Sequence, residues 1–80
     1  MKLPRDLSGE QLAAGLCRRW AYQRVHQVGS HIILETETPG HQRLAIPAHK
    51  VLKIGTLGNI LRAVSTHKEV SREELLESLL

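Results

Sequence analysis

Aromatic side chains are scarce in this chain, which has one tryptophan, one tyrosine and no phenylalanine in 80 residues. Proteins that hold single-stranded nucleic acid commonly stack its bases on aromatic side chains, and few are available here. We expect Trp20 to lie in the hydrophobic core rather than to serve in this way. Any contact with a nucleic acid would therefore be led by its phosphates, with weak sequence selectivity.

Cysteine and long apolar runs are also nearly absent. Because Cys17 is the only cysteine, the chain can form no internal disulfide, and a lone thiol is more often a small core residue than a nucleophile. No apolar run approaches the roughly 18 residues of a membrane-spanning helix, and residues 1–5 lack the apolar stretch of a signal peptide. We expect no membrane contact and a cytoplasmic location.

The composition that remains is that of a folded domain, with 41% hydrophobic and 24% charged residues. The length predicts one domain over residues 1–80. Residues 1–62 contain nine Lys or Arg and four Asp or Glu, whereas residues 63–80 contain two and four. A nucleic acid would bind the basic part, although many mildly basic small proteins have no such partner.

Capping signals and apolar spacing predict three helices. A capping box at residues 8–11 starts a helix that runs to about Arg19. Apolar residues spaced i, i+3, i+4, i+7 over residues 57–64 predict a second helix, entered through a Gly55-Thr56 cap. A short third helix is predicted to begin at Ser71.

Between the first two helices, from Ala21 to Ile46, apolar residues tend to alternate with polar ones, with turn residues at Gly29-Ser30 and Pro39-Gly40. This pattern predicts three antiparallel strands. The predicted fold is therefore α+β: a helix, three antiparallel strands, a helix and a short helix, with the helices on one face of the sheet. The double-stranded-RNA-binding fold has the same order of elements, although a shared fold does not establish function.

The hairpin turn determines which side chains share a face of the sheet. With Gly29-Ser30 as a two-residue loop, Val28 lies opposite His31 and Arg24 lies opposite Glu35, on the face that points away from the helices. The face that the helices cover is predicted to contain Val25, Ile32, Leu34, Leu44 and Ile46. His31 is therefore expected to share the open face with Arg24.

Five histidines invite a metal interpretation, but their spacing does not support one. No Cys/His knuckle or H-E-x-x-H pattern occurs, and the face assignment leaves His41 at a distant turn, away from His26, His31 and His49. A Gly-rich phosphate loop is also absent. Ser30 and His31 are neighbours whose side chains point to opposite sides of a strand, which argues against a serine hydrolase. We predict no metal and no cofactor.

An exposed histidine near cationic side chains fits metal-free RNA cleavage. The ribose 2′-hydroxyl attacks the adjacent phosphorus once a base removes its proton, and an imidazole with a pKa of about 6.5 can act as this base or as the acid for the leaving oxygen. A neighbouring Arg or Lys would stabilise the charge that develops on the phosphate. On spacing alone, a solvated histidine after a turn is the commoner case.

Short motifs occur along nearly the whole chain. They are, in order, Lys2-Leu3-Pro4-Arg5, Leu7-Ser8-Gly9, Tyr22, Gly29-Ser30-His31, Ile46-Pro47-Ala48-His49, Gly55-Thr56-Leu57 and Ile60-Leu61-Arg62. In this order and with this spacing they resemble the HicA toxin family. The resemblance implies a small ribonuclease toxin of a type II toxin–antitoxin system, with a double-stranded-RNA-binding-like fold, that cuts mRNA and is silenced by a partner HicB antitoxin.

By position, His31 matches the catalytic histidine of that family, and Gly29 and Ser30 match the turn that presents it. Gly29 can adopt the positive φ of a tight hairpin, and Ser30 can hydrogen-bond the turn or a phosphate. Both residues also fit an ordinary turn. His49 is a candidate second acid or base or a phosphate ligand, or a side chain that ties down the loop after Pro47.

Three basic side chains are expected to bind RNA phosphates, namely Arg24, Lys50 and Lys53. Solvated surface charge is the usual role of such residues. Three positions depart from the family. Ala21 stands where the family often has Gly, and His26 and Val28 stand where it often has a basic residue. Arg24, or His26 when protonated, would compensate for the two missing cations. Two alternatives therefore stay open: a non-catalytic RNA-binding module, and a protein-interaction domain, which Val28 favours.

Overall fold

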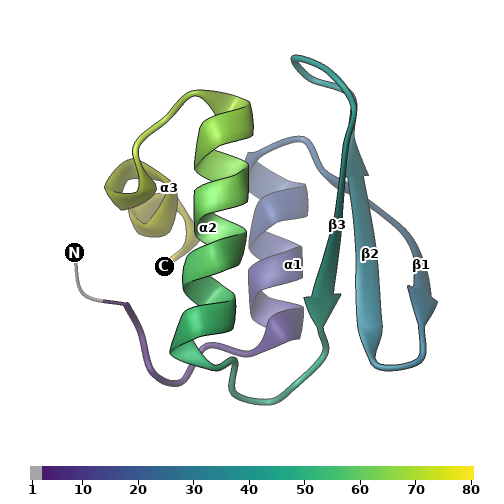
Figure 1. The fold of residues 1–80 in the computed structure, drawn as a ribbon, viewed down its shortest axis with the longest axis vertical. Helices are drawn as coiled ribbons and strands as arrows, with labels where there is room; N and C mark the ends of the chain where they lie inside the picture. Colours follow the sequence, from purple (N-terminus) through teal and green to yellow (C-terminus); the bar gives the residue numbers. More distant parts are fainter. Residues whose placement is uncertain (1–2) are drawn as a thin grey trace.

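The computed structural model describes residues 3–80, so Lys2 of the first motif lies outside the described residues. Six elements follow one another: α1 (Gly9–Arg19), β1 (Gln23–Val28), β2 (His31–Thr36), β3 (Gln42–Pro47), α2 (Ile54–Lys68) and α3 (Arg72–Leu79). The strands form one antiparallel sheet in the order β1-β2-β3. α1 and α2 cover one face of the sheet. α3 packs against these two helices on their side that points away from the sheet (Figure 1). The predicted α+β layout is confirmed.

Side chains of β2 and β3 alternate between the two faces, as their sequence pattern predicts. Ile32 and Leu34 of β2 are fully buried, and Leu44 and Ile46 of β3 pair with them under the helices. The helices contribute a matching apolar surface that consists of Leu12, Leu16, Leu57, Ile60, Leu61 and Val64. The other face of the sheet, which we call the open face, has no helix of residues 3–80 packed on it (Figure 1).

A β-bulge in β1 overturns part of the predicted register. The pairing shifts between Arg24 and His26, so Arg24 pairs with Leu34 and not with Glu35. A bulge adds one residue to one strand, and side chains beyond it change face. Because Leu34 faces the helices, Arg24 lies on the helix side of the sheet. The prediction that Arg24 shares the open face with His31 is therefore wrong.

The turn between β1 and β2 agrees with the prediction. Gly29 has a φ of 59°, in the left-handed region that glycine adopts without strain. Val28 and His31 pair directly across this turn.

Of the five residues predicted to lie on the covered face, Val25 is the exception, since it lies at the bulge and is 41% exposed. Its predicted place in the core is wrong because the extra residue interrupts the alternation there.

α1 and α3 begin at their predicted caps. The Ser8 hydroxyl accepts a hydrogen bond from the Gln11 N–H at 3.0 Å, and the Gln11 side chain accepts one from the Ser8 N–H at 2.9 Å. The Ser71 hydroxyl accepts from the Glu74 N–H at 3.0 Å. These bonds satisfy backbone groups that a helix leaves without partners at its start.

α3 is held on α1 and α2 by apolar contacts and by one side-chain hydrogen bond. Leu75 and Leu76 are buried against the core. Trp20, which follows α1, is partly buried, and its indole Nε1–H donates to the Ser78 hydroxyl at 2.7 Å. Trp20 thus packs against the core, at its edge and not within it, with its one polar atom satisfied.

α2 begins one residue before the predicted Gly55-Thr56 cap. Its N-cap is Lys53, which has an extended backbone and whose carbonyl accepts from the Leu57 N–H at 2.9 Å. The predicted cap residues therefore lie within the first turn of the helix. At 15 residues, α2 is the longest described helix. None of the helices within residues 3–80 combines the length and apolar character needed to cross a membrane.

Candidate functional site

One end of the sheet contains the turn between β1 and β2 and the last residues of β3, and we call it the turn end. Backbone hydrogen bonds hold this end together. The Ala48 N–H donates to the Ser30 carbonyl at 2.6 Å, and the Gly9 N–H donates to the His49 carbonyl at 2.9 Å. The loop of residues 48–53 is therefore tied both to the hairpin turn and to the start of α1. The first turns of α1 and α2 lie at this same end (Figure 1).

Gly9 allows the start of α1 to lie against the end of β3. A Cβ at position 9 would fall 1.8 Å from the carbonyl oxygen of Pro47, which is far closer than non-bonded atoms can approach. Pro47 is also the residue of β3 that pairs with His31. The glycine in the Leu7-Ser8-Gly9 motif thus fixes α1 against the strand that flanks the candidate catalytic histidine.

Five candidate residues of the sequence lie at the turn end, namely Ser30, His31, His49, Lys50 and Lys53. All five are exposed. Within residues 3–80, none of their side chains forms a hydrogen bond or an ion pair. His31 lies on the open face, and His49 lies two residues beyond its strand partner Pro47. The turn end therefore presents two unpaired imidazoles and two unpaired ammonium groups to solvent.

Arg24 does not belong to this group of free side chains. Its guanidinium donates to both carboxylate oxygens of Glu10, at 2.9 and 3.3 Å, and to the Gln27 side chain at 2.8 Å. The hydrogen bond to Glu10 raises the pKa of Arg24 above its usual value. The bulge directs this cation to α1 and Glu10, so it does not place a charge beside Val28 and His31.

His26 lies beside a cation of the open face. Its Nε2 is 3.3 Å from Nη2 of Arg43. Because a guanidinium can only donate, Nε2 of His26 accepts in this contact. The compensation by His26 that the sequence suggests stays a prediction.

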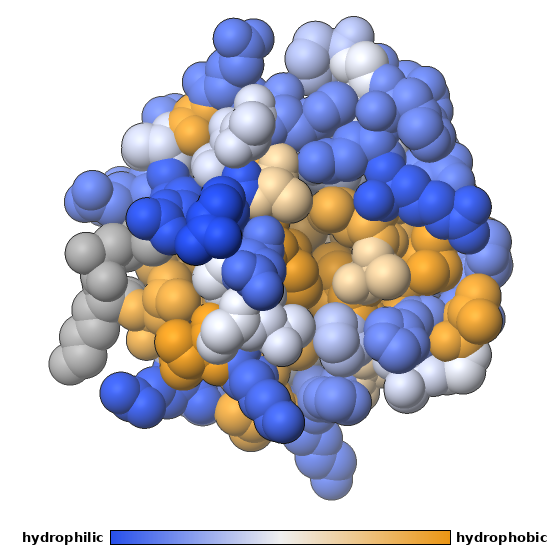
Figure 2. Space-filling model, viewed as in Figure 1, coloured by the Kyte–Doolittle hydropathy of each residue, from blue (hydrophilic) through white to orange (hydrophobic). Residues whose placement is uncertain are grey.

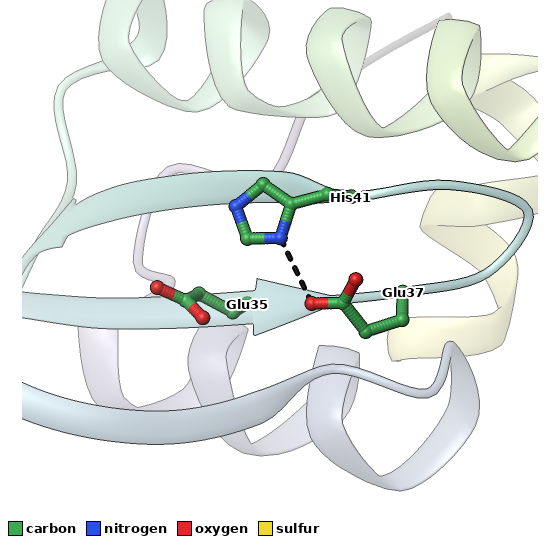
Figure 3. A group of neighbouring side chains, drawn as sticks. All are labelled: Glu35, Glu37 and His41. Atoms are coloured by element: carbon green, nitrogen blue, oxygen red, sulfur yellow. Dashed lines mark hydrogen bonds and ion pairs between the residues drawn. The ribbon is translucent and has the colours of Figure 1, made fainter.

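A second cluster lies at the other end of the sheet, which we call the acidic end. Glu35, Glu37 and His41 each place one potential metal-ligating atom within 4.8 Å of the others (Figure 3). Nδ1 of His41 is 2.8 Å from Oε2 of Glu37. This hydrogen bond raises the pKa of His41 above 6.5. Sequence spacing among the histidines does not reveal this cluster, because its other two members are carboxylates joined to His41 only by the β2–β3 loop.

A buried polar network supports the acidic end from the helix side. Thr36 is 2% exposed, and its hydroxyl donates to the Ala21 carbonyl at 2.9 Å. Nζ of Lys68 donates to the Thr36 hydroxyl at 2.9 Å and to the Thr38 carbonyl at 2.6 Å, and lies 4.8 Å from the centre of the Tyr22 ring. Burial lowers the pKa of Lys68 and raises the pKa of Tyr22 to about 12.

Exposed apolar residues accompany the free side chains of the turn end. Val28 is 56% exposed opposite His31, and Val51 and Ile54 are 54% and 37% exposed beside Lys50 and Lys53. On the face seen in Figure 2, hydrophobic residues likewise reach the surface among hydrophilic ones. The turn end is therefore both basic and partly apolar.

No protein-family model, curated protein or solved structure matches this chain. The fold and the site define a small α+β protein of the order α-β-β-β-α-α with an exposed, basic, histidine-containing end. A fold of this kind does not determine an activity, so the function must be argued from the side chains of the two ends.

Proposed function

We propose that the protein is a metal-independent endoribonuclease that cuts mRNA, a toxin of the HicA type that a HicB-type antitoxin neutralises. The observation that carries the proposal is the distribution of the five histidines. The two without a partner in residues 3–80, His31 and His49, are both at the turn end. The other three are hydrogen-bonded, His26 to Arg43, His41 to Glu37 and His67 to Gly40.

In the proposed reaction the RNA supplies its own nucleophile. His31 removes the proton from a ribose 2′-hydroxyl, and this oxygen attacks the adjacent phosphorus. The 5′-oxygen leaves with a proton donated by an acid, a role assigned to His49, and the products are a 2′,3′-cyclic phosphate and a free 5′-hydroxyl. Lys50 and Lys53 bind the phosphates and offset the negative charge of the transition state.

The sequence motifs support the same proposal independently of the histidine distribution. Gly29-Ser30-His31 resembles a motif of the HicA family, and the positive φ of Gly29 in the hairpin turn is compatible with this resemblance. Ser30 keeps its hydroxyl free for a phosphate within the part of the chain described. Because mRNA is the proposed substrate, the proposed compartment is the cytoplasm, and an antitoxin would act most simply by covering the turn end.

A protein-interaction domain without catalysis is a second candidate, which one observation favours. Val28 is 56% exposed directly opposite His31, at the position where a phosphate-binding cation would be useful. Exposed apolar residues beside basic ones are typical of a protein-binding surface. In this case the turn end would bind an acidic partner and would not cut RNA.

Expression of the wild-type chain and of His31→Ala in bacteria tests the proposal. The wild type should arrest growth and degrade mRNA, and the purified protein should cut RNA equally well in the presence of a chelator. His31→Ala should abolish both effects, because an acid–base residue contributes about 10²- to 10⁴-fold to the rate.

The same experiment separates the alternatives. Intact RNA and normal growth with the folded wild type would sink the nuclease proposal. Salt-sensitive RNA binding by both proteins, without cleavage, would identify a non-catalytic RNA-binding module. A folded wild type that neither binds nor cuts RNA would favour the protein-interaction domain.

A further inference from the structure

The acidic end places three metal-ligating side chains together by means of one hairpin. Glu35 and Glu37 are two residues apart, and successive alternate positions along an extended chain lie on the same side. The β2–β3 loop then returns His41 to the two carboxylates (Figure 3). The three donors therefore come from both arms of the loop, and their placement depends on the fold and not on a local sequence motif.

The donor set is that of a first-row transition ion. One imidazole nitrogen and two carboxylate oxygens bind Zn²⁺, whereas Ca²⁺ and Mg²⁺ prefer oxygen ligands throughout. Bonds of about 2.0–2.2 Å separate the ligand atoms of a tetrahedral zinc site by about 3.3 Å. The present separations reach at most 4.8 Å. Small rotations of partly exposed side chains would close this difference.

Glu35 is the least exposed member of the cluster. Its side chain is 28% exposed, and it forms an ion pair with Arg43, whose Nη1 lies 3.7 Å from Oε2 of Glu35. No hydrogen bond from residues 3–80 reaches its carboxylate. Because the ion pair is long and leaves both oxygens without hydrogen bonds, a metal ion can bind this carboxylate in exchange for Arg43.

Solvent can supply the remaining ligands of an ion. Glu37 and His41 are exposed, so water reaches the cluster. A zinc ion held by three protein ligands usually completes its coordination with water. A hollow of about 210 Å³ also borders the two carboxylates on the side of Ala21 and Gln23, but His41 does not line it.

We infer that Glu35, Glu37 and His41 form a binding site for a divalent transition-metal ion such as Zn²⁺, which joins the two arms of the β2–β3 loop. The inference does not rest on the proposed nuclease activity. Glu35 lies four residues from His31 along β2, about 13 Å away at the rise of an extended strand. The metal site and the turn end are therefore separate.

Isothermal titration of the tag-free full chain with Zn²⁺ tests the inference. The wild type should bind one ion, and Mg²⁺ at the same concentration should bind far more weakly. His41→Asn and Glu37→Gln should each weaken Zn²⁺ binding by at least about tenfold, the smallest loss found when even an outer-shell partner of a metal site is removed. The matched control His49→Asn, which removes an exposed imidazole at the turn end, should leave the affinity unchanged.

Arg43→Gln provides a test of opposite sign. Because Arg43 is the cation now nearest to Glu35, its removal should tighten Zn²⁺ binding, whereas a merely structural role for Arg43 would weaken it. In the wild type, substoichiometric Mn²⁺ should broaden the amide signals of residues 35–41 before those of residues 29–31 and 48–53. Equal Zn²⁺ affinity of the wild type and a folded His41→Asn variant would overturn the inference, as would first broadening at the turn end.

Discussion

The two ends of the sheet are held in opposite ways. At the turn end, backbone groups bond one another while the side chains of His31, His49, Lys50 and Lys53 have no partners in residues 3–80. At the acidic end, side chains bond side chains, from His41 and Glu37 on the outside to Lys68 and Thr36 within. Hydrogen bonds between main-chain groups fix the backbone and leave the side chains free to bind a substrate. In a side-chain network the same groups are already hydrogen-bonded to one another.

Because of this difference, histidines at the two ends differ in whether they are free to hydrogen-bond a substrate. The imidazole of His41 is hydrogen-bonded to the Glu37 carboxylate, which raises the pKa of His41. The imidazoles of His31 and His49 meet only solvent within the described chain, so a substrate is free to hydrogen-bond them. The number of histidines near a surface is therefore less informative than the number of their existing partners.

The largest expected effect comes from removing an imidazole at one end and not at the other. In a chelator-resistant cleavage assay, His49→Ala should lower the rate by about 10²-fold, because the leaving oxygen loses its acid. His41→Ala should leave the rate unchanged. A full rate for His49→Ala would leave His31 as the sole acid–base residue and would contradict the role given to His49.

Gly9→Ala should give the next largest effect, because it disrupts the backbone bonds of the turn end. The added Cβ would meet the Pro47 carbonyl oxygen at 1.8 Å, and separating α1 from β3 would break the bond from the Gly9 N–H to the His49 carbonyl. We expect a loss of about 3 kcal/mol or more in the free energy of unfolding, measured in urea. Gly55→Ala is the matched control: apart from the adjacent residues and the backbone of α2 itself, no heavy atom of residues 3–80 lies within 4 Å of the added Cβ. It should stabilise α2 by about 0.5–1 kcal/mol. Equal effects of the two substitutions would contradict the close approach.

The buried network of the acidic end predicts a loss of stability at high pH. Burial raises the pKa of Tyr22 from 10.0 to about 12, so the unfolded chain releases this proton first. The contribution of Tyr22 is therefore complete below about pH 10 and is lost as the pH rises through about 12, a decline of roughly 2–3 kcal/mol. The lowered pKa of Lys68 acts in the opposite direction over part of this range.

The sole tyrosine makes this measurement direct. Ultraviolet absorbance of the native protein should report tyrosinate formation near the raised pKa of about 12. Tyr22→Phe should remove the decline in unfolding free energy above about pH 10. A native tyrosinate midpoint near 10 would show that the phenol is not buried in solution.

The smallest effect should come from exchanging Ala and Gly at the two ends. Ala21, whose carbonyl accepts from Thr36 at the acidic end, has a φ of 61°, and Gly29 at the turn end has a φ of 59°. A left-handed conformation costs a non-glycine residue about 1–2 kcal/mol, and glycine loses about 0.5–1 kcal/mol through entropy. Ala21→Gly should therefore stabilise the fold by up to about 1 kcal/mol, and Gly29→Ala should destabilise it by a similar amount, both measured in urea. Shifts of the same sign would contradict the strain at Ala21.

Local signals in the sequence predict most of the fold. Ser8 and Ser71 have the side chains that cap a helix, and the turn at Gly29-Ser30 places Ile32 and Leu34 on the covered face of β2, where both are fully buried. The bulge at Val25 escapes prediction because the pairing of β1 depends on its contacts with β2 and α1, and no glycine or proline marks the site. A single extra residue in one strand is sufficient to redirect Arg24.

The candidate residues divide in the same way. Ser30, His31, His49, Lys50 and Lys53 were placed at one end by the turn and by the loop after β3, which are local features of the sequence. The cluster of Glu35, Glu37 and His41 depends on the path of the β2–β3 loop, so spacing along the chain does not predict it. Residues next to a turn or to the end of a strand are easier to place from the sequence than residues that the return of a loop brings together.

The hydrogen bond between Trp20 and Ser78 gives the protein an optical reporter of its own. Trp20 is the only tryptophan, and its indole N–H bonds a residue of α3. Detachment of α3 would expose the indole ring to water and shift its fluorescence to longer wavelength, while the sheet and its two ends kept their structure. Emission spectra can therefore follow the last helix separately from the rest of the chain, without a label.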